Sequence, residues 1–447
     1  MALQFILGPS GAGKSEYIYE DIIRRTMQDE RENVIVLVPE QYSLEIQRKL
    51  VQKHPRGGSF QIDVIGFNRL AYRIFDELHI KPKKVLEDFG KSMLLRKAAQ
   101  EHKEELSLYA GSLDKAGFID EAKSLMSEIY QYDIPRERLR EALQKLDDSE
   151  EARVLARKLQ DMLVIFDAFE EKKGQSFIVA EQMLELLTAA AEQSEMIAGS
   201  EIVLDGFTGF TPIQLNLISV LLRRAKKVTI VLTIDAATYE KKHVAEHELF
   251  ALTKQTIEHL LLTAEQAHVV VEPALFLGKD GCKRWSKGHP LAHLEQNLFR
   301  YPYRVGKDEE QAITITAYDT PAQELTGVAE QIRTLVMEQG YRYRDIAIVS
   351  GNLEETAEFA KRILPQYEIP YFIDMTMPVK NHPCVDALTH VLRIVDENFS
   401  YDSVFAFLKS GVVKSLEQSE IEMLENYVLA RGRKGIRLSL IHISEPT

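Results

Sequence analysis

An eight-residue segment near the N-terminus constrains the fold of this chain more than any other feature. Residues 8–15 read Gly-Pro-Ser-Gly-Ala-Gly-Lys-Ser and match the P-loop pattern G-x-x-x-x-G-K-[ST]. An apolar run at residues 3–7 precedes the segment, and a helical pattern at residues 16–27 follows it. Because this pattern binds phosphate between a strand and a helix, the sequence predicts an α/β fold that begins with a nucleotide site.

The chemistry of a triphosphate explains why these residue types occur together. Glycine allows the positive φ angles and the close approach through which backbone N–H groups turn toward an anion. The following helix adds the positive end of its dipole. We expect Lys14 to reach the β- and γ-phosphates of ATP and the Ser15 hydroxyl to ligate Mg²⁺. The predicted nucleotide-binding residues are Gly8, Pro9, Ser10, Gly11, Ala12, Gly13, Lys14 and Ser15.

Strand and helix patterns alternate further along the chain. Apolar runs that predict buried parallel strands occur in the segments 33–39, 62–75, 201–208 and 228–235. Residues 90–198 instead carry apolar side chains at helical spacing, which predicts a helical insertion between two strands of one sheet. Ligands of such parallel sheets bind at the carboxyl ends of the strands.

A second α/β block follows residue 300. Its strand patterns lie at residues 312–317, 345–350 and 369–373, and its helix patterns at residues 321–339 and 353–364. We therefore predict a nucleotide-binding domain from residues 1–90 and 200–300, a helical insertion at residues 91–199 and an incomplete second α/β domain at residues 301–435.

The last residues are interpreted as foreign to the fold. Residues 437–447 are taken to be an artefact, because Ser439–Thr447 resembles the translated sequencing-adaptor peptide that ends many truncated metagenomic reading frames. The remaining chain is interpreted as the N-terminal part of a longer protein.

Composition limits the classes of function. Over 447 residues the formal net charge is −13, which argues against nucleic-acid binding through overall basicity but is compatible with a local basic groove. Cys282 and Cys384 lack the spacing of metal ligands and are interpreted as reduced, buried thiols. The apolar runs are shorter than the ~20 residues of a membrane span, and no signal-peptide pattern is present. We expect a soluble, cytoplasmic protein without membrane contact.

A P-loop hydrolase also needs carboxylates at the end of a neighbouring strand. Asp205 follows the apolar run 202–204 and is predicted to hold Mg²⁺ together with Ser15. The next position would supply the base that orients the attacking water, but Gly206 has no side chain. Because general-base catalysis contributes about 10²–10⁴-fold, we expect ATP binding with little or no hydrolysis and assign no catalytic residue. A charged residue from elsewhere in the chain remains an alternative base.

Taken in order, these motifs resemble those of the AddB family, the B subunits of bacterial AddAB (RexAB) helicase-nucleases. The motifs are the P-loop, Val-Pro-Glu-Gln at 38–41, Phe-Asn-Arg-Leu-Ala-Tyr-Arg at 67–73 and Val-Leu-Asp-Gly-Phe-Thr-Gly-Phe-Thr at 203–211. The resemblance covers residues 1–435 and implies a P-loop NTPase of UvrD-like superfamily-1 helicase architecture. In that architecture the three predicted parts are a 1A-like domain, a 1B-like insertion and a partial, second RecA-like (2A-like) domain.

The resemblance implies a role in processing DNA double-strand breaks for homologous recombination. It implies a heterodimer with an AddA-type helicase-nuclease subunit, and contact with single-stranded and double-stranded DNA ends that includes reading of a Chi-type sequence. A Mg²⁺-dependent nuclease site and a 4Fe-4S cluster are expected only in a carboxy-terminal part beyond these residues. No arginine occurs at residues 318–324, where an active helicase would direct one at the γ-phosphate, so the resemblance implies that this is not the motor subunit.

Candidate contacts to single-stranded DNA lie on one strand–helix junction. Single-strand channels combine basic side chains with aromatic platforms for base stacking. The residues that offer this mixture are Phe67, Asn68, Arg69, Tyr72 and Arg73. The alternative is that the two aromatic residues belong to the core and the two arginines are solvated.

Two other functions remain open at the level of sequence. An active superfamily-1 helicase or DNA-stimulated ATPase would need a replacement for the missing glutamate after Asp205. A P-loop kinase acting on a small molecule is disfavoured by the long helical insertion and the second α/β block.

Overall fold

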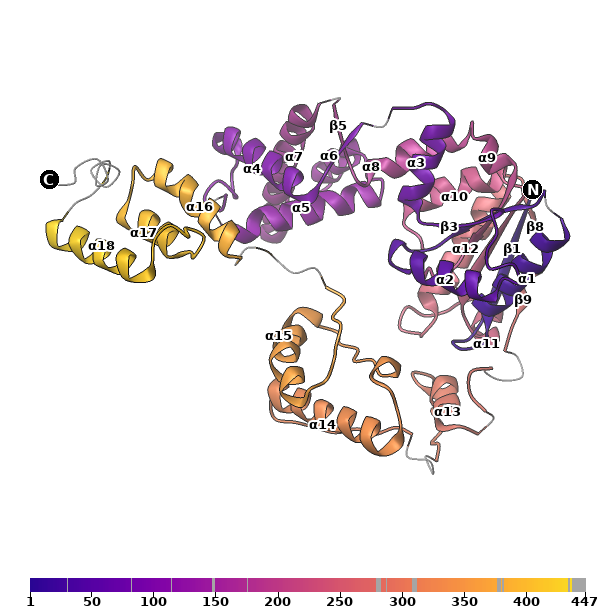
Figure 1. Ribbon diagram of the computed structural model, residues 1–447. Coiled ribbons are helices and arrows are strands. Elements are labelled where there is room, and N and C mark those ends of the chain that lie inside the picture. The colour runs from indigo at the N-terminus through magenta and orange to yellow at the C-terminus, as the bar shows by residue number, and fades with distance from the viewer. Residues whose placement is uncertain are drawn as a thin grey trace. The chain divides into compact units, whose positions relative to one another are not determined.

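The computed structural model divides into two compact units, Met1–Thr314 and Ile315–Thr447, and each is described by itself (Figure 1). The structure describes residues 1–435 with the exception of 30, 82, 114, 147–148, 175, 279–282, 287, 308–311, 376–378, 380–381 and 433–434. Cys282 and the segment 437–447, both interpreted above from sequence, lie outside the described residues. Cys384 is a free cysteine, but the expectation that it is buried is wrong, because its position at the start of a helix leaves it exposed. No helix in the described part of the chain is long and apolar enough to cross a membrane.

A parallel sheet forms the centre of the first unit. Within the described residues its seven strands are β1 (Ala2–Gly8), β2 (Asn33–Leu37), β3 (Ile62–Ile65), β6 (Ser200–Leu204), β7 (Lys227–Thr233), β8 (Val270–Val271) and β9 (Leu275–Phe276). They run in the order β3-β2-β6-β7-β1-β8, and β9 also pairs with β1. All of these pairs are parallel, which confirms the predicted α/β fold with a parallel sheet.

Alternating side chains of the strands pack on opposite faces of this sheet. In β2, Val34 and Val36 belong to one apolar cluster, whereas Ile35 and Leu37 belong to the other. The first face is covered by α1 (Lys14–Gln28) and α2 (Ser43–Lys53). The second face is covered by α3 (Phe67–Glu77), α8 (Gln182–Ala191), α10 (Pro212–Arg224) and α12 (Ala251–Gln266).

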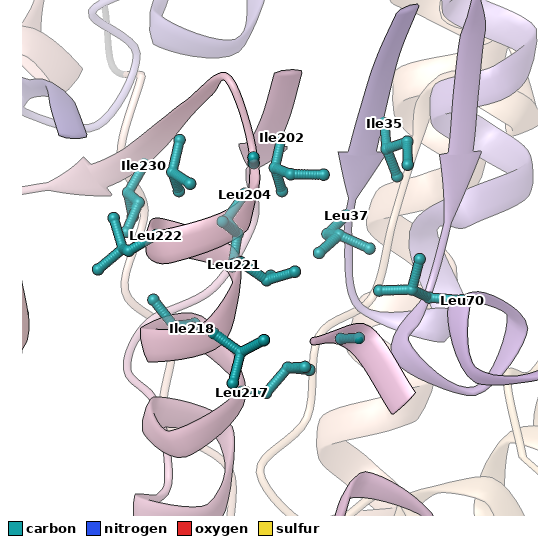
Figure 2. Packing of buried hydrophobic residues seen from close by; sticks show 14 of the residues in the cluster. Ile35, Leu37, Leu70, Ile202, Leu204, Leu217, Ile218, Leu221, Leu222 and Ile230 are labelled. Carbon is teal, nitrogen blue, oxygen red and sulfur yellow. The ribbon is translucent and has the colours of Figure 1, made fainter. Parts of the chain in front are cut away.

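The apolar cluster on the second face contains more buried residues than the cluster on the first face. Figure 2 shows Leu37 of β2 and Leu204 of β6 beside Leu221 of α10, all three with no exposed surface. Burying a side chain of this size contributes about 1.5–3 kcal/mol, so the continuous apolar runs seen in the sequence hold both layers of helices on the sheet.

The helices predicted for residues 91–199 lie in chain order between β3 and β6. They are α4 (Asp88–Glu101), α5 (Ala116–Gln131), α6 (Arg136–Gln144), α7 (Glu150–Lys173), α8 and α9 (Glu195–Ala198), and α4 to α7 gather together in Figure 1. A separate apolar cluster that includes Leu95, Met126 and Phe166 joins α4, α5 and α7. Two short strands, β4 (Lys84–Leu86) and β5 (Phe177–Val179), form a parallel pair that sequence patterns did not predict.

The second unit contains helices but no described strand. Its helices are α14 (Pro321–Gln339), α15 (Leu353–Ile363), α16 (Pro383–Asp396), α17 (Tyr401–Lys409) and α18 (Gln418–Arg431). The strands predicted at 312–317, 345–350 and 369–373 are wrong for the described residues, which have irregular backbone there. The physical reason is the lack of a pairing neighbour: Ile315, Val349 and Phe372 are 94%, 93% and 87% exposed.

Candidate nucleotide-binding site

The P-loop lies at a switch point of the sheet. β1 and β7 are neighbours, but the helix after β1 covers one face of the sheet, whereas α12, which follows β7, covers the other. Such a divergence opens a crevice at the carboxyl ends of the two strands, and ligands of α/β proteins bind in crevices of this kind. Residues 8–15 connect the end of β1 to α1 at this position.

The backbone of the loop is wound around the side chain of Lys14. Gly13 precedes α1 with φ 83°, a left-handed conformation that glycine adopts without strain. The N–H of Ala12 donates to the carbonyl of Pro9 at 3.3 Å. The ammonium of Lys14 donates to the carbonyl oxygens of Gly8 at 2.9 Å and Pro9 at 2.8 Å, and the residue is only 9% exposed. The cation therefore lies inside the loop, and its contact with the phosphates of ATP stays a prediction.

Asp205 lies at the carboxyl end of β6 and is 5% exposed. Its Oδ2 accepts a hydrogen bond from the Tyr19 hydroxyl at 2.6 Å, and its Oδ1 accepts one from the N–H of Gly206 at 2.9 Å. Burial raises the pKa of Tyr19, and the neighbouring charge of Asp205 raises it further, so the phenol stays a proton donor. Both carboxylate oxygens of Asp205 thus have partners supplied by the protein.

Sequence reasoning missed Tyr19. The residue is 186 positions from Asp205, and only the fold brings the two together. One signal was present in the sequence: Tyr19 follows Ser15 by four residues, and such residues share a face of a helix. A tyrosine one turn after the P-loop serine therefore faces the strand ends.

Gly206 occupies a backbone conformation that suits glycine. Its φ is +83°, and a Cβ built on it would lie 3.3 Å from Cδ of Pro39. A residue with a side chain in the left-handed region is strained by about 1–2 kcal/mol. The sequence places no side chain at this position, and the structure adds that the backbone is poorly suited to carry one.

Ser15 and Asp205 have the chemistry of a magnesium site. Mg²⁺ prefers oxygen ligands and in nucleotide sites is held by one or two protein groups together with phosphates. Ser15 is exposed on the first turn of α1, and a carboxylate that accepts one hydrogen bond on each oxygen keeps further lone pairs. The donor set fits the ion, with Tyr19 as a competitor for Asp205. Among the described residues no group of three or more His, Cys, Asp or Glu side chains could hold a metal.

A cavity of about 1030 Å³ adjoins the P-loop. Its walls include Pro9, Phe276, Trp285, Glu295 and Arg300. This volume is in the range of ligand pockets, about 300–1,000 Å³. The helix α13 (Pro290–Asn297), which sequence patterns did not predict, supplies part of the wall.

Charged groups line the cavity. Asp235 follows β7, accepts the N–H of Thr238 at 2.7 Å and pairs with Arg300, whose Nη2 lies 3.1 Å from its Oδ2. Burial raises the pKa of Asp235, but hydrogen bonds from Thr238 and Arg300 outweigh it and leave the pKa below its usual value. Among the described residues that line this cavity Arg300 is the only arginine, and no sequence pattern singled it out.

The candidate DNA-binding residues all lie on α3, but they differ in exposure. Phe67 is half-buried and packs against Phe207 with ring centroids 5.5 Å apart. Asn68, Arg69, Tyr72 and Arg73 are exposed. Arg73 forms an ion pair with Asp63, and the backbone N–H of Asn68 donates to Glu40 at 3.0 Å. The charge of Arg69 also acts on Asp63, and Tyr72 is 47% exposed.

Known proteins resemble this chain over nearly all of its length. Residues 5–295 match the family model described as "ADDB, N-terminal". The chain is 38% identical to the B subunit of the "ATP-dependent helicase/deoxyribonuclease" of Lachnoclostridium phytofermentans over 439 aligned residues. The aligned region covers 97% of the chain and 38% of that relative. It is 32% identical to the B subunits of the same name from Clostridium novyi and Clostridium tetani, covering 97% and 98% of the chain.

The chain spans 38% of the length of each of these relatives. The family model covers well over half of the chain, in the region that holds the sheet, the P-loop and Asp205. The resemblance read from the motifs is thereby confirmed, and the chain belongs to the AddB family, with its match in the N-terminal region.

Proposed function

We propose that this chain forms the nucleotide-binding, helicase-like part of the B subunit of an ATP-dependent helicase-nuclease that processes DNA double-strand breaks for homologous recombination. Its relatives are named as B subunits of an "ATP-dependent helicase/deoxyribonuclease". The observation that carries the proposal is a contrast between two sites at the carboxyl ends of the strands. After β1 the P-loop surrounds the side chain of Lys14. After β6 the carboxylate of Asp205 accepts a hydrogen bond from Tyr19 and is followed by Gly206.

In this proposal the chain binds ATP and Mg²⁺ and hydrolyses ATP slowly or not at all. Lys14 and the N-terminus of α1 hold the phosphates, because both supply positive charge at the loop. Ser15 and Asp205 hold Mg²⁺, which would neutralise part of the phosphate charge. With Gly206 in the position of the base, water is not oriented for attack, and the nucleotide serves binding or regulation instead of a motor cycle.

The proposal assigns DNA binding to the exposed face of α3. Arg69 would contact a phosphate, and Tyr72, which is 47% exposed, offers a surface for base stacking. Because the relatives are named as one subunit of an enzyme, we also propose a partner, the AddA-type motor. The formal charge of −13 implies that any DNA contact is confined to a local surface of this kind.

Equilibrium binding of a fluorescent ATP analogue to the full chain tests the nucleotide site. We expect Mg²⁺-dependent binding that Lys14→Ala weakens about 100-fold, because the ammonium makes charge-assisted hydrogen bonds to phosphate. Lys97→Ala, an exposed lysine on α4, is the matched control and should bind like the wild type. Equal affinity of the wild type and Lys14→Ala, with both chains folded, would contradict the proposal.

A further inference from the structure

A second segment of the chain is hydrogen-bonded to the phosphate loop. After β9 the backbone N–H of Leu277 donates to the carbonyl oxygen of Leu7, near the end of β1, at 2.8 Å. Further along, the backbone N–H of Arg284 donates to the carbonyl oxygen of Gly11 at 3.2 Å. The first bond joins the chain after β9 to the strand that leads into the loop, and the second joins it to the loop itself. Residues 283–286 are thereby held beside the groups predicted to bind phosphate.

Within this segment the side chain of Lys283 lies against the loop. Gly13 has no side chain, and a Cβ built on it would lie 3.3 Å from Cδ of Lys283. The apolar stem of this lysine therefore packs on the backbone of the residue that precedes Lys14. Lys283 is exposed and lines the same cavity as Pro9. Because a lysine extends its ammonium beyond a packed stem, the charge lies at the solvent side of the loop.

The other cations near the loop already have partners. Lys14 donates to two carbonyl oxygens inside the loop. Nη2 of Arg300 lies 3.1 Å from Oδ2 of Asp235. The guanidinium of Arg284 lies over the indole ring of the next residue, with its Cζ 5.8 Å from the ring centroid. Within the described part of the chain no carboxylate forms an ion pair with Lys283, so its ammonium is available to an anion from outside the protein.

We infer that Lys283 is a second phosphate-binding cation of the nucleotide site, whose ammonium contacts the phosphate chain held by the loop. The inference deepens the proposed function and rests on it. A triphosphate is a dense anion, and each further cation at close range lowers its energy. Lys283 acts from an exposed position, where water weakens the attraction, so it contributes less than the buried Lys14.

The position of Lys283 selects the phosphate chain as its ligand. Backbone N–H groups of a P-loop hold the α- and β-phosphates, and the stem of Lys283 packs on that backbone at Gly13. The ammonium of a lysine is a compact point charge on a flexible stem, so it contacts a phosphate oxygen without a fixed geometry. The contact therefore forms with ATP and also with inorganic tripolyphosphate, which has no base.

Isothermal titration calorimetry of the full chain tests this inference, with Mg²⁺ and tripolyphosphate in one series and Mg²⁺ and ATP in another. Lys283→Met removes the charge and keeps an unbranched apolar stem, whereas Lys283→Arg keeps the charge. Lys226→Met is the matched control for the loss of one positive charge. Lys226 is exposed and directly precedes β7, so it lies at the amino ends of the strands, away from the loop.

The expected result is that Lys283→Met binds both ligands about tenfold more weakly than the wild type, because a charge-assisted contact to phosphate is lost. Lys283→Arg should recover most of this affinity, and Lys226→Met should bind like the wild type. Recovery by arginine distinguishes a charge contact from a general effect on the loop. Lys283→Gln replaces Lys283→Met if that variant does not fold.

The negative results separate this inference from the proposal on which it rests. If the wild type binds both ligands in a Lys14-dependent manner and Lys283→Met binds them equally well, the role of Lys283 is wrong and the nucleotide site stands. A loss of affinity for ATP without a loss for tripolyphosphate would also contradict the inference, because the contact would then not be to phosphate. If the wild type binds neither ligand, both the site and the inference are wrong.

Discussion

The loop after β1 and the end of β6 differ in what they offer a nucleotide: the loop surrounds a buried cation, whereas the end of β6 carries a carboxylate that is already hydrogen-bonded and is followed by a residue without a side chain. The loop after β1 surrounds a buried lysine, whose ammonium lies 2.8–2.9 Å from two loop carbonyls. After β6 the carboxylate of Asp205 is bound by a tyrosine and followed by a glycine in a left-handed conformation. Because the two groups lie on different strands, binding and hydrolysis of a nucleotide can be separated by substitutions at one of them.

Among substitutions near the end of β6, we expect Tyr19→Phe to lower the free energy of unfolding the most. Tyr19→Phe leaves Oδ2 of the buried Asp205 without its donor, and a hydrogen bond to a charged group contributes about 1.5–3 kcal/mol. The free energy of unfolding of the first unit should fall by that amount, measured in urea by the fluorescence of Trp285. Tyr17→Phe changes a tyrosine that is 38% exposed on the same helix and should shift the midpoint very little. Equal midpoints for the two variants would show that the contact with Asp205 adds nothing.

Gly206→Glu places a second carboxylate directly after Asp205 at the end of β6. Gly206→Glu should lower stability by about 1–2 kcal/mol, because its φ of +83° strains any residue with a side chain. We expect no gain in ATP turnover, since a glutamate held in this backbone conformation is not aimed as a base. Gly206→Ala separates backbone strain from charge and should lose similar stability. A stable Gly206→Glu variant that hydrolyses ATP would contradict our interpretation of this strand end.

In the cavity beside the P-loop, Asp235→Asn tests the charge pair between Asp235 and Arg300. The pKa of Asp235 in the folded protein is lowered, so its ionised form stabilises the fold at pH values above the usual 3.8, and this contribution is lost as the pH falls through the folded value. Asparagine also caps helices, so the change isolates the charge, which we expect to contribute up to about 1 kcal/mol. The melting temperatures of the wild type and Asp235→Asn should differ at pH 7, and the difference should shrink as the pH falls below 3.8. Asp76→Asn, at an exposed aspartate of α3, should show no such convergence.

The smallest effect concerns DNA. Arg69→Ala should weaken binding of single-stranded DNA about threefold and reduce the slope of log K against log salt by about 0.7, the value for one lost phosphate contact. Arg73→Ala should have less effect, because Arg73 is already paired with Asp63. Arg48→Ala, an exposed arginine on α2, is the control. If Arg48→Ala and Arg69→Ala weaken binding equally, α3 is not a specific contact.

The features that sequence predicted are those set by local patterns. The buried strands at 33–39 and 228–235 could be recognised because runs of β-branched and aliphatic residues mark strands that are covered on both faces. The loop at residues 8–15 was recognisable because each position is constrained by the same anion. These two kinds of signal were sufficient for the parallel sheet and for the loop that joins β1 to α1.

What sequence did not predict depends on contacts between distant segments. The pairing of Tyr19 with Asp205 joins residues 186 positions apart, and the pairing of Asp235 with Arg300 joins residues 65 positions apart. The two-residue strands β8 and β9 form because each pairs with β1, and two residues are too few to show a strand pattern in the sequence. In the second unit the same strand patterns failed for the opposite reason, because no described neighbour pairs with them.

Steady-state ATP turnover by the full chain, with and without single-stranded DNA, tests the central claim most directly. Wild type and Lys14→Ala would be compared under conditions where the wild type is saturated with ATP. We predict binding that depends on Lys14, and a turnover rate in the wild type that DNA does not stimulate and that stays close to the rate of Lys14→Ala. A rapid rate that DNA stimulates and that Lys14→Ala abolishes would show that this chain is a motor, and that a residue other than the one at position 206 orients the water.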